Sequence, residues 1–219
     1  MLSVLGTGEA PISVASGSGR TLAFTIREIG SVTSRIKDSK SVGVRGPYGT
    51  HWPWKKYDEV LAIAGGIGIP PVRSLIEEMV DAGKERNLEV LYGARTPSDI
   101  VYKREINEWG KSIDIHLTVD RGDSGWRGNT GFVPSLLKDV HLGKDAAVFV
   151  IGPPLMMMNT VKEALEMGYR EDRIFLSLER RMECGIGVCG HCNVGEFYAC
   201  EAGPIFNYSD VKGEKELFL

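Results

Sequence analysis

From Val60 onward, short apolar runs alternate with longer stretches in which apolar residues recur every three or four positions. Apolar runs of this length are typical of strands buried on both faces, and the recurring positions are typical of helices. Their alternation predicts a parallel sheet with crossover helices. The expected strands are Val60–Ala64, Leu88–Tyr92, Ile113–Thr118, Ala146–Ile151 and Arg173–Leu178. The expected helices are Pro71–Ala82, Asp99–Trp109, Val133–Lys138 and Leu155–Met167.

The pattern before Val60 is different, because apolar and polar residues alternate one by one. Leu22–Arg27 and Ser41–Arg45 show this alternation, and Met1–Leu5 resembles a strand that is already under way. A short helix is expected within Ser31–Lys40, and Gly46–Gly49 has the composition of a turn. Because so few strands cannot close a barrel unaided, we expect a partial antiparallel β-barrel. Either a partner completes this sheet or the chain begins late.

Composition and charge exclude several classes of function. The net charge is −3, and no long basic run suggests binding to nucleic acid. No apolar stretch is long enough to span a bilayer, and the N-terminus lacks the pattern of a signal peptide. We therefore expect a cytoplasmic protein without a membrane span.

All four cysteines lie close together near the C-terminus, at positions 184, 189, 192 and 200. The spacing C-x4-C-x2-C begins like the plant-type run that binds a [2Fe–2S] cluster, with a fourth ligand further along the chain. Gly185, Gly187 and Gly190 lie between the first ligands, where they can adopt positive φ and expose backbone N–H groups. These residues predict a [2Fe–2S] cluster held by Cys184, Cys189, Cys192 and Cys200.

Two other arrangements of these cysteines stay open. Zinc sites usually pair two C-x2-C units, whereas only Cys189 and Cys192 form one here. Two disulfides would be typical of a small secreted domain, which this chain of 219 residues does not resemble. The four histidines, at positions 51, 116, 141 and 191, are scattered along the sequence, so no histidine-rich metal site is expected.

A nucleotide site is indicated by glycines at two junctions between a strand and a helix. Gly65, Gly66 and Gly68 follow the first strand of the parallel sheet, and Gly152 and Pro153 follow the fourth. Glycines let the backbone approach a pyrophosphate, which the helix N-terminus attracts through its free N–H groups and dipole. The order G-x-G-x-x-G is absent, and glycines also occupy such junctions for steric reasons alone.

Four motifs in order resemble the ferredoxin–NADP reductase family, in the branch of dihydroorotate dehydrogenase electron-transfer subunits and sulfhydrogenase gamma subunits. The motifs are Ala10–Ser13, Gly46–Gly49, Ala64–Pro71 and the segment from Glu179 to Cys200. The resemblance spans nearly the whole chain, which looks short at its N-terminus beside that family. It implies FAD between a β-barrel and a nucleotide domain.

The resemblance implies which residues bind the flavin. The family's Arg-Pro-Ile-Ser segment appears here as Pro11, Ile12 and Ser13, with Ala10 in place of the arginine. Ile26 and Arg27 would also contact FAD, and Gly30–Thr33, including Val32, resembles the family's pyrophosphate-binding turn.

The nicotinamide nucleotide, NAD or NADP, would by resemblance lie along the glycines of the two junctions. Arg95 and Arg121 could pair with a 2′-phosphate, and Asp120 could instead bind a ribose hydroxyl. Each is equally plausible as a solvated loop charge. Glu179 would lie near the flavin or pair with Arg180 or Arg181. The methionines Met156–Met158 are interpreted as helix surface and core.

These expectations describe an oxidoreductase subunit that passes electrons between NAD(P)H, FAD and a [2Fe–2S] cluster, to or from a catalytic partner such as a hydrogenase or dihydroorotate dehydrogenase. The expected division is a flavin-binding barrel at 1–58, an NAD(P)-binding domain at 59–178 and a cluster segment at 179–219. The alternative is a nucleotide-binding module without flavin that keeps a structural or sensing cluster or a zinc site.

Overall fold

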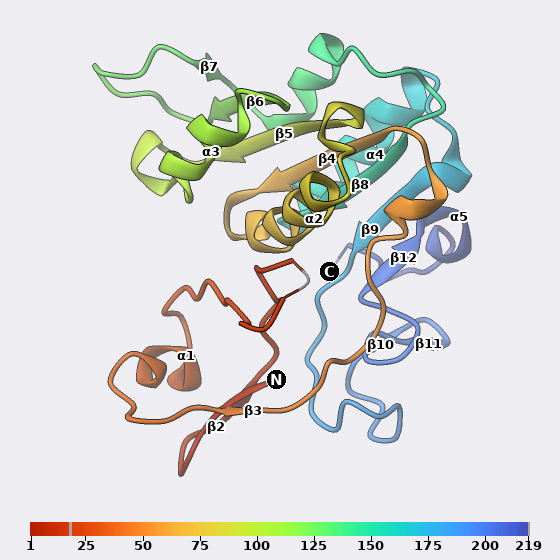
Figure 1. The fold of residues 1–219 in the computed structure, drawn as a ribbon. Helices are drawn as coiled ribbons and strands as arrows, with labels where there is room; N and C mark the ends of the chain where they lie inside the picture. The colour runs from red at the N-terminus through yellow and green to blue at the C-terminus, as the bar shows by residue number, and fades with distance from the viewer. Residues whose placement is uncertain (18, 219) are drawn as a thin grey trace.

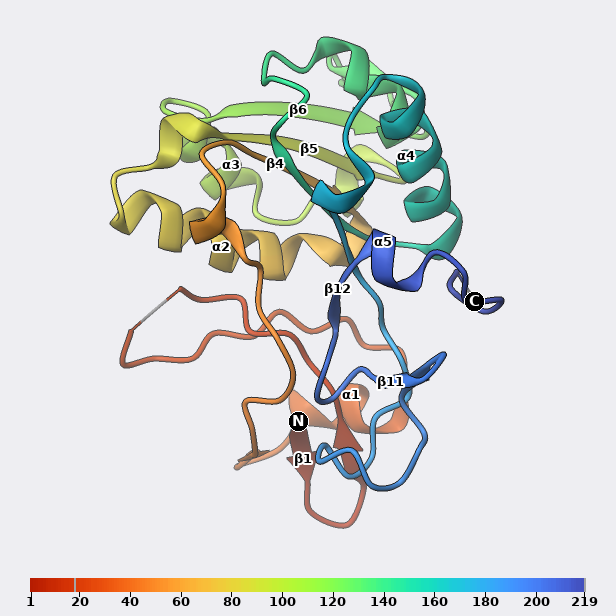
Figure 2. The same ribbon diagram turned by 90° about the vertical axis from the view of Figure 1, so that its right-hand side faces the viewer.

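The computed structural model describes residues 1–17 and 19–218. Its N-terminal strands lie below a large sheet, and the cysteine-bearing segment lies beside them, as Figure 1 shows in red and blue. Figure 2 shows helix α2, Ile69–Asp81, between the large sheet and the N-terminal strands. The chain therefore forms an antiparallel part, a mostly parallel sheet and a C-terminal cysteine segment, which confirms the predicted fold class.

The N-terminal sheet has three short antiparallel strands in the order β2-β1-β3. They are β1 Leu2–Val4, β2 Gly8–Ala10 and β3 Gly43–Val44. Helix α1, Ser31–Ile36, packs on this sheet by burying Val32. The predicted strand at the start of the chain and the predicted helix are both confirmed.

The predicted strand Leu22–Arg27 is wrong. Its only strand-like pairing within residues 1–17 and 19–218 is an isolated bridge from Phe24 to Val14. The Ala15 N–H donates to the Ala23 carbonyl at 2.8 Å, but no continuous ladder follows. Alternation shows which residues could share a face, whereas a strand also needs a neighbour to pair with. Leu22 is accordingly exposed.

The large sheet has seven strands in the order β12-β9-β8-β4-β5-β6-β7. The five predicted parallel strands are confirmed, with shifted ends: β4 Val60–Gly65, β5 Leu88–Ala94, β6 Asp114–Val119, β8 Ala147–Ile151 and β9 Ile174–Ser177. Two further strands were not predicted. They are the parallel β7, Asn129–Thr130, and the antiparallel β12, Ile205–Asn207.

Two long helices pack on opposite faces of this sheet. Helix α2 buries Val72 and Leu75 in the cluster that contains alternate residues of β4 such as Ala62. Helix α4, Pro154–Glu166, buries Met157 and Val161 against the other face. Strands buried on both sides need apolar residues at every position, which explains why their runs do not alternate.

Two predicted helices differ in detail from what is observed. Helix α3 covers Lys103–Trp109 and not Asp99–Trp109. Thr96 and Asp99 close the separate 3₁₀ turn η4, Pro97–Asp99, and Tyr102 then adopts a left-handed φ of 60° before α3 begins. The helix expected at Val133–Lys138 is a 3₁₀ helix, η5, over Val133–Asp139.

The remaining elements are short. They are the 3₁₀ turns η1 Trp54–Lys56, η2 Gly66–Gly68, η3 Glu85–Asn87 and η6 Glu171–Arg173, the hairpin β10 Asn193–Val194 and β11 Phe197–Tyr198, and helix α5 Tyr208–Val211. The segment before β4 joins the core of the large sheet, because Trp52 stacks on Phe149 with ring centroids 4.9 Å apart. Within the described part of the chain, no helix is long and apolar enough to cross a membrane.

Candidate functional site

The two glycine junctions meet at one edge of the large sheet. Strand β4 continues to β5 and β6 on one side, and the chain then returns to place β8 on the other side of β4. A ligand site in an open α/β sheet forms at such a reversal, outside the carboxyl ends of the strands. Gly65 ends β4, Gly152 follows β8, and the N-termini of α2 and α4 lie beside them.

The packing at this reversal requires glycine. A Cβ on Gly65 would lie 2.4 Å from the Met156 sulfur, and one on Gly152 would lie 2.7 Å from the same atom. A Cβ on Gly68 would approach the Ile151 carbonyl oxygen to 2.9 Å. Gly66 has a φ of +55°, and a Cβ there would meet nothing within 4 Å, so its backbone is open to a ligand.

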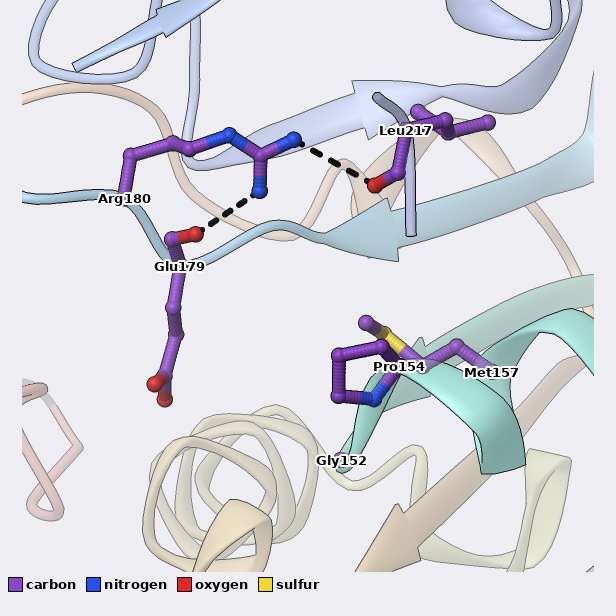
Figure 3. Close-up of a pocket in the computed structure, with 6 residues that line it drawn as sticks. All are labelled: Gly152, Pro154, Met157, Glu179, Arg180 and Leu217. Carbon is purple, nitrogen blue, oxygen red and sulfur yellow. Dashed lines mark hydrogen bonds between the residues drawn. The ribbon is translucent and has the colours of Figure 1, made fainter. Parts of the chain in front are cut away.

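A cavity of about 230 Å³ opens next to this edge. Figure 3 shows its lining, which consists of Gly152, Pro154, Met157, Glu179, Arg180 and Leu217. Met157 lines the cavity although the sequence suggested only a core or surface role for this methionine run. The C-terminal end of the chain thus contributes to the same cavity as the β8–α4 junction.

Glu179 follows β9 and its side chain is exposed on the cavity. Figure 3 shows its carboxylate pointing away from the Arg180 guanidinium, which donates instead to the backbone carbonyls of Glu179 and Leu217. Arg181 pairs with Glu183 at 2.9 Å. Across residues 1–17 and 19–218, the Glu179 carboxylate forms no salt bridge, so the alternative of a pairing with Arg180 or Arg181 is not observed.

The charged residues predicted after β5 and β6 lie at neighbouring strand ends. The Arg121 N–H donates to the Arg95 carbonyl at 3.0 Å, and the Asp120 N–H donates to the Ala94 carbonyl at 2.9 Å. All three predicted side chains, Arg95, Asp120 and Arg121, are exposed. Their closeness follows from the parallel pairing of β5 with β6.

Arg27 reaches the same region from the N-terminal part. A hydrogen bond from Thr96 lowers the pKa of Asp99, and the positive charges of Arg27 and Arg95 lower that pKa further. The charges of Arg27 and Arg95 thus act on the same carboxylate although 68 positions separate the two residues in sequence (95 − 27 = 68).

The segment that follows Pro11, Ile12 and Ser13 is fastened to α2. Arg73 donates to the Ala15 carbonyl at 2.7 Å, and Ser74 donates to the Ser16 carbonyl at 2.8 Å. The chain directly after the predicted flavin segment thus packs against the helix whose N-terminus lies at the nucleotide edge. Pro11 and Ser13 are exposed and Ile12 is half-buried.

The other predicted flavin residues lie at the start of α1. The Thr33 hydroxyl accepts hydrogen bonds from the backbone N–H groups of Gly30 at 2.9 Å and Ile29 at 3.1 Å. Val32 is buried, with its side chain next to Gly8, and Ile26 is half-buried. The Thr33 hydroxyl thus has a structural role in closing the turn.

The cysteine loop has the backbone that its glycines predict. Gly185, Gly187 and Gly190 have φ values of +80°, +68° and +77°, a region that glycine adopts without steric cost. The Ile186 N–H points at the Cys184 sulfur at 3.4 Å, and the Gly187 N–H points at the Cys200 sulfur at 3.2 Å. Such N–H groups stabilise negative charge on sulfur.

All four cysteines are free thiols in this structure. The backbone N–H groups of Ile186 and Cys189 lower the pKa of the Cys184 thiol, and the N–H of His191 lowers that of Cys189. Burial raises the pKa of Cys200. The exposed end of the loop therefore favours thiolates, while Cys192 and Cys200 lie in the interior.

The four thiols form two pairs and do not all surround one point. Cys184 contacts Cys189 through their side chains, and Cys200 contacts Cys192. Among the described residues, no three of these sulfurs lie within 4.8 Å of one another. A tetrahedral zinc site brings its four ligands around one ion, whereas a two-iron cluster binds two thiolates at each iron.

Arg45 and Tyr48 hold the cysteine loop, a role that sequence reasoning missed. Arg45 donates to the carbonyl of Cys184 at 2.7 Å, to that of Glu183, and to the Tyr48 hydroxyl at 2.8 Å. It also pairs with Glu9 at 2.6 Å in the N-terminal sheet. The Tyr48 ring lies under Gly185, where any Cβ would come within 3 Å of it. In the sequence, only the Gly46–Gly49 motif pointed to this region.

Two of the histidines that are scattered in sequence are brought together in the fold. His116 lies 2.7 Å from a carboxylate oxygen of Glu89, and His141 lies 3.6 Å from the same oxygen. Scatter along the sequence therefore gave no information about which histidines are neighbours in space. The signal in sequence was a lone glutamate in an apolar run, at the second position of β5.

Two protein-family models match separate parts of the chain. Residues 62–163 match the oxidoreductase NAD-binding domain. Residues 179–212 match the iron-sulfur cluster binding domain of dihydroorotate dehydrogenase B. The first match covers both glycine junctions, and the second covers all four cysteines and Glu179.

Curated relatives align with nearly all of the chain. Sulfhydrogenase 1 subunit gamma of Pyrococcus furiosus is 36% identical over 96% of this chain and 78% of its own length. The probable dihydroorotate dehydrogenase B (NAD(+)) electron transfer subunit of Methanocaldococcus jannaschii is 32% identical over 94% of this chain and 76% of its own length.

Solved structures share the fold at lower identity. An NADH-dependent reduced ferredoxin-NADP oxidoreductase superposes with a TM-score of 0.74 at 24% identity, covering 94% of this chain and 77% of that one. A ferredoxin NADP+ reductase from Neisseria gonorrhoeae with bound FAD and NADP gives a TM-score of 0.57 at 18% identity, covering 75% and 77%.

Proposed function

We propose that this chain passes electrons between NAD(P)H, FAD and a [2Fe–2S] cluster. The chain belongs to the family of sulfhydrogenase gamma subunits and dihydroorotate dehydrogenase B electron-transfer subunits. This membership agrees with the resemblance that the sequence motifs carry. One observation supports the proposal most strongly. Glu179, next to the nucleotide edge, is only five positions before Cys184 in the cysteine loop (184 − 179 = 5).

The nucleotide would bind at the reversal between β4 and β8. Gly65, Gly66 and Gly68 leave room for a pyrophosphate at the N-terminus of α2, and Gly152 and Pro153 do so at α4. Arg95 and Arg121 would bind a 2′-phosphate, and Asp120 would bind ribose hydroxyls instead if the substrate is NAD.

The flavin would lie between the N-terminal part and α2. The proposed contacts are the backbone of Pro11, Ile12 and Ser13, the Ile26–Arg27 segment and the turn that comprises Gly30, Val32 and Thr33. A flavin exchanges electrons in pairs with nicotinamide and singly with an iron–sulfur cluster. Arg27 supports this placement, because its exposed guanidinium lies near the residues that follow β5 and supplies a charge for a phosphate.

The cluster would be held by Cys184 and Cys189 on one iron and by Cys192 and Cys200 on the other. This assignment rests on the two observed side-chain pairs and on the N–H groups that point at the sulfurs. The separation of the thiols disfavours zinc. Glu179 is proposed to lie near the flavin and to hold or accept a proton there, because its carboxylate is exposed on the cavity and has no ion-pair partner among the described residues.

A catalytic partner subunit would take or supply the electrons. Cys189 is exposed, and its neighbours Ile186 and Val188 are exposed apolar side chains, which suits a contact surface for another protein. The relatives' partners are a hydrogenase or a dihydroorotate dehydrogenase by name. We further propose the division into a flavin-binding part at 1–58, an NAD(P)-binding part at 59–178 and a cluster segment at 179–219. The flavin-free alternative is not favoured by the relatives, which are named as electron-transfer or gamma subunits.

A cysteine substitution tests this function. Cys189→Ser should abolish the cluster and electron delivery to a one-electron acceptor protein, while NAD(P)H binding and flavin content stay unchanged. His191→Ala is the matched control, because His191 lies between two ligands but is proposed to be none itself. Electron delivery by Cys189→Ser at the wild-type rate would contradict the proposed route.

A further inference from the structure

A second metal-binding geometry lies on the large sheet, outside the cysteine loop and the nucleotide edge. It comprises Glu89 near the start of β5, His116 in β6 and His141 in the loop after η5. One ligand atom from each residue lies within 4.8 Å of the other two. Among residues 1–17 and 19–218, no other three histidine, cysteine, aspartate or glutamate side chains bring their ligand atoms this close together.

The three side chains converge closely enough for one ion to reach all of them. A carboxylate oxygen of Glu89 lies 2.7 Å from His116 Nε2 and 3.6 Å from His141 Nδ1, and the two rings are 6.1 Å apart between centroids. Zinc bonds of about 2.0–2.2 Å to nitrogen and oxygen place two tetrahedral ligands a little over 3 Å apart. The 2.7 Å contact between His116 and Glu89 would therefore lengthen when an ion binds, whereas the 3.6 Å separation of His141 from Glu89 already suits it.

The glutamate is prepared for a ligand role by its surroundings. Glu89 is only 1% exposed, although a carboxylate is rarely buried without compensation. Its second oxygen accepts the backbone N–H groups of His141 at 3.0 Å and Leu142 at 3.3 Å. These hydrogen bonds orient the first oxygen towards the histidines, as outer partners orient the ligands of metal sites.

Access to solvent is available from one side. The His141 side chain is 75% exposed, and that of His116 is 20% exposed. The loop also places the Glu59 carboxylate nearby, where it accepts the Gly143 N–H at 3.1 Å. The exposed His141 ring therefore leaves an entry path for an ion to Glu89.

From this geometry we propose that Glu89, His116 and His141 form a structural site for a divalent transition metal, with Zn²⁺ as the expected ion. Two imidazoles and one carboxylate are a ligand set that Zn²⁺ accepts. The site would fasten the loop after η5 to β5 and β6. It lies at the amino ends of the strands, opposite the nucleotide edge, so it takes no part in the proposed electron route.

The ordinary alternative is an internal ion pair between Glu89 and a protonated His116. Both arrangements satisfy the buried carboxylate, but only the metal site requires His141. The ion pair and the metal site also differ in their response to added Zn²⁺. Only the metal site would bind the ion through nitrogen and oxygen ligands. His141 is therefore the residue to change.

Zinc binding to the purified protein tests the proposal. The protein is treated with EDTA, its cluster is checked by iron content and visible absorption, and ZnCl₂ is then titrated by calorimetry. We expect one Zn²⁺ per chain, a nitrogen and oxygen shell by zinc K-edge X-ray absorption, and a rise in Tm. Since loss of an outer partner already weakens metal sites by about 10–100-fold, His141→Ala should weaken binding by about 100-fold or more.

Controls separate this site from the cysteines and from misfolding. His51→Ala removes an exposed histidine elsewhere and should bind Zn²⁺ like the wild type. His116→Gln should also lose binding while circular dichroism confirms that it is folded. A wild-type protein that binds no Zn²⁺, a sulfur shell, or unchanged affinity in His141→Ala would each overturn the proposal.

Discussion

At the scale of single residues, Arg45 connects several groups, and no pattern in the sequence indicates this role. Its guanidinium joins Glu9, Tyr48 and the carbonyls of Glu183 and Cys184, which are 138 and 139 positions away. A planar fork with several donors can serve these partners at once, and a lysine cannot. The cysteines could be predicted because their spacing is local. Arg45 could not, because its partners are backbone oxygens that only the fold brings near.

Arg45→Ala should make the cysteine loop release its cluster more readily. The variant loses the donors that hold the carbonyls before and at Cys184, so we expect cluster loss in a chelator to be about tenfold faster, by analogy with outer partners of metal sites. The decay of visible absorption measures this rate. Arg35→Ala, on the exposed surface of α1, should decay like the wild type; equal rates for both variants would contradict the proposed role.

Tyr169→Phe tests a buried hydroxyl. Tyr169 is 3% exposed, its hydroxyl has no hydrogen-bond partner among the described residues, and burial raises its pKa to about 12. Below about pH 10 the hydroxyl is protonated in both the folded and the unfolded chain. Between about pH 10 and 12 the unfolded chain loses this proton first, so stability falls as pH rises, by roughly 2–3 kcal/mol in total.

The Tyr169→Phe variant lacks the hydroxyl and should lose less stability between about pH 10 and 12 than the wild type. At pH 7 its free energy of unfolding should be equal or higher, because no hydrogen bond is removed. Urea unfolding at pH 7 and at pH 11 measures both effects. A variant that is clearly less stable at pH 7 would show that the hydroxyl has a partner.

At the scale of elements, the fully apolar strands were the easiest to predict and the short strands the hardest. Strands β4, β5 and β8 are buried on both faces, so their composition alone reveals them. Strand β12 has only three residues, and its antiparallel place beside β9 is decided by the chain returning from the cysteine loop. The candidate sites show the same difference. The glycine junctions could be predicted because their residues are close in sequence, whereas the Glu89–His116–His141 group could not, because its residues are far apart in sequence.

Gly66→Ala tests the proposed nucleotide junction against a matched glycine. Gly66 and Gly83 have φ values of +55° and +65°, and a Cβ on either would meet nothing within 4 Å. Alanine at either position should therefore cost a similar amount, about 1–2 kcal/mol of stability. Only Gly66→Ala should weaken NAD(P)H binding, because Gly83 lies after α2 and away from the edge. Equal affinities in the two variants would remove Gly66 from the site.

At the scale of the whole molecule, three parts of the chain meet around α2 and the cysteine loop. Arg73 and Ser74 of α2 hold the segment after the predicted flavin motif, and Arg45 joins the N-terminal sheet to the cysteine loop. Glu179 then connects the nucleotide edge to that loop. Family membership was predictable from four short motifs, whereas these connections depend on contacts between segments far apart in sequence.

The proposed function requires that electrons from a nicotinamide nucleotide reach the cysteine loop. The most direct measurement is an anaerobic titration of the purified protein with NADH and with NADPH, followed by visible absorption and by electron paramagnetic resonance. We predict that one nucleotide bleaches a flavin band and that the signal of a reduced [2Fe–2S] cluster then appears. A protein that carries no flavin, or a cluster that stays oxidised while nucleotide is consumed, would contradict the proposed function.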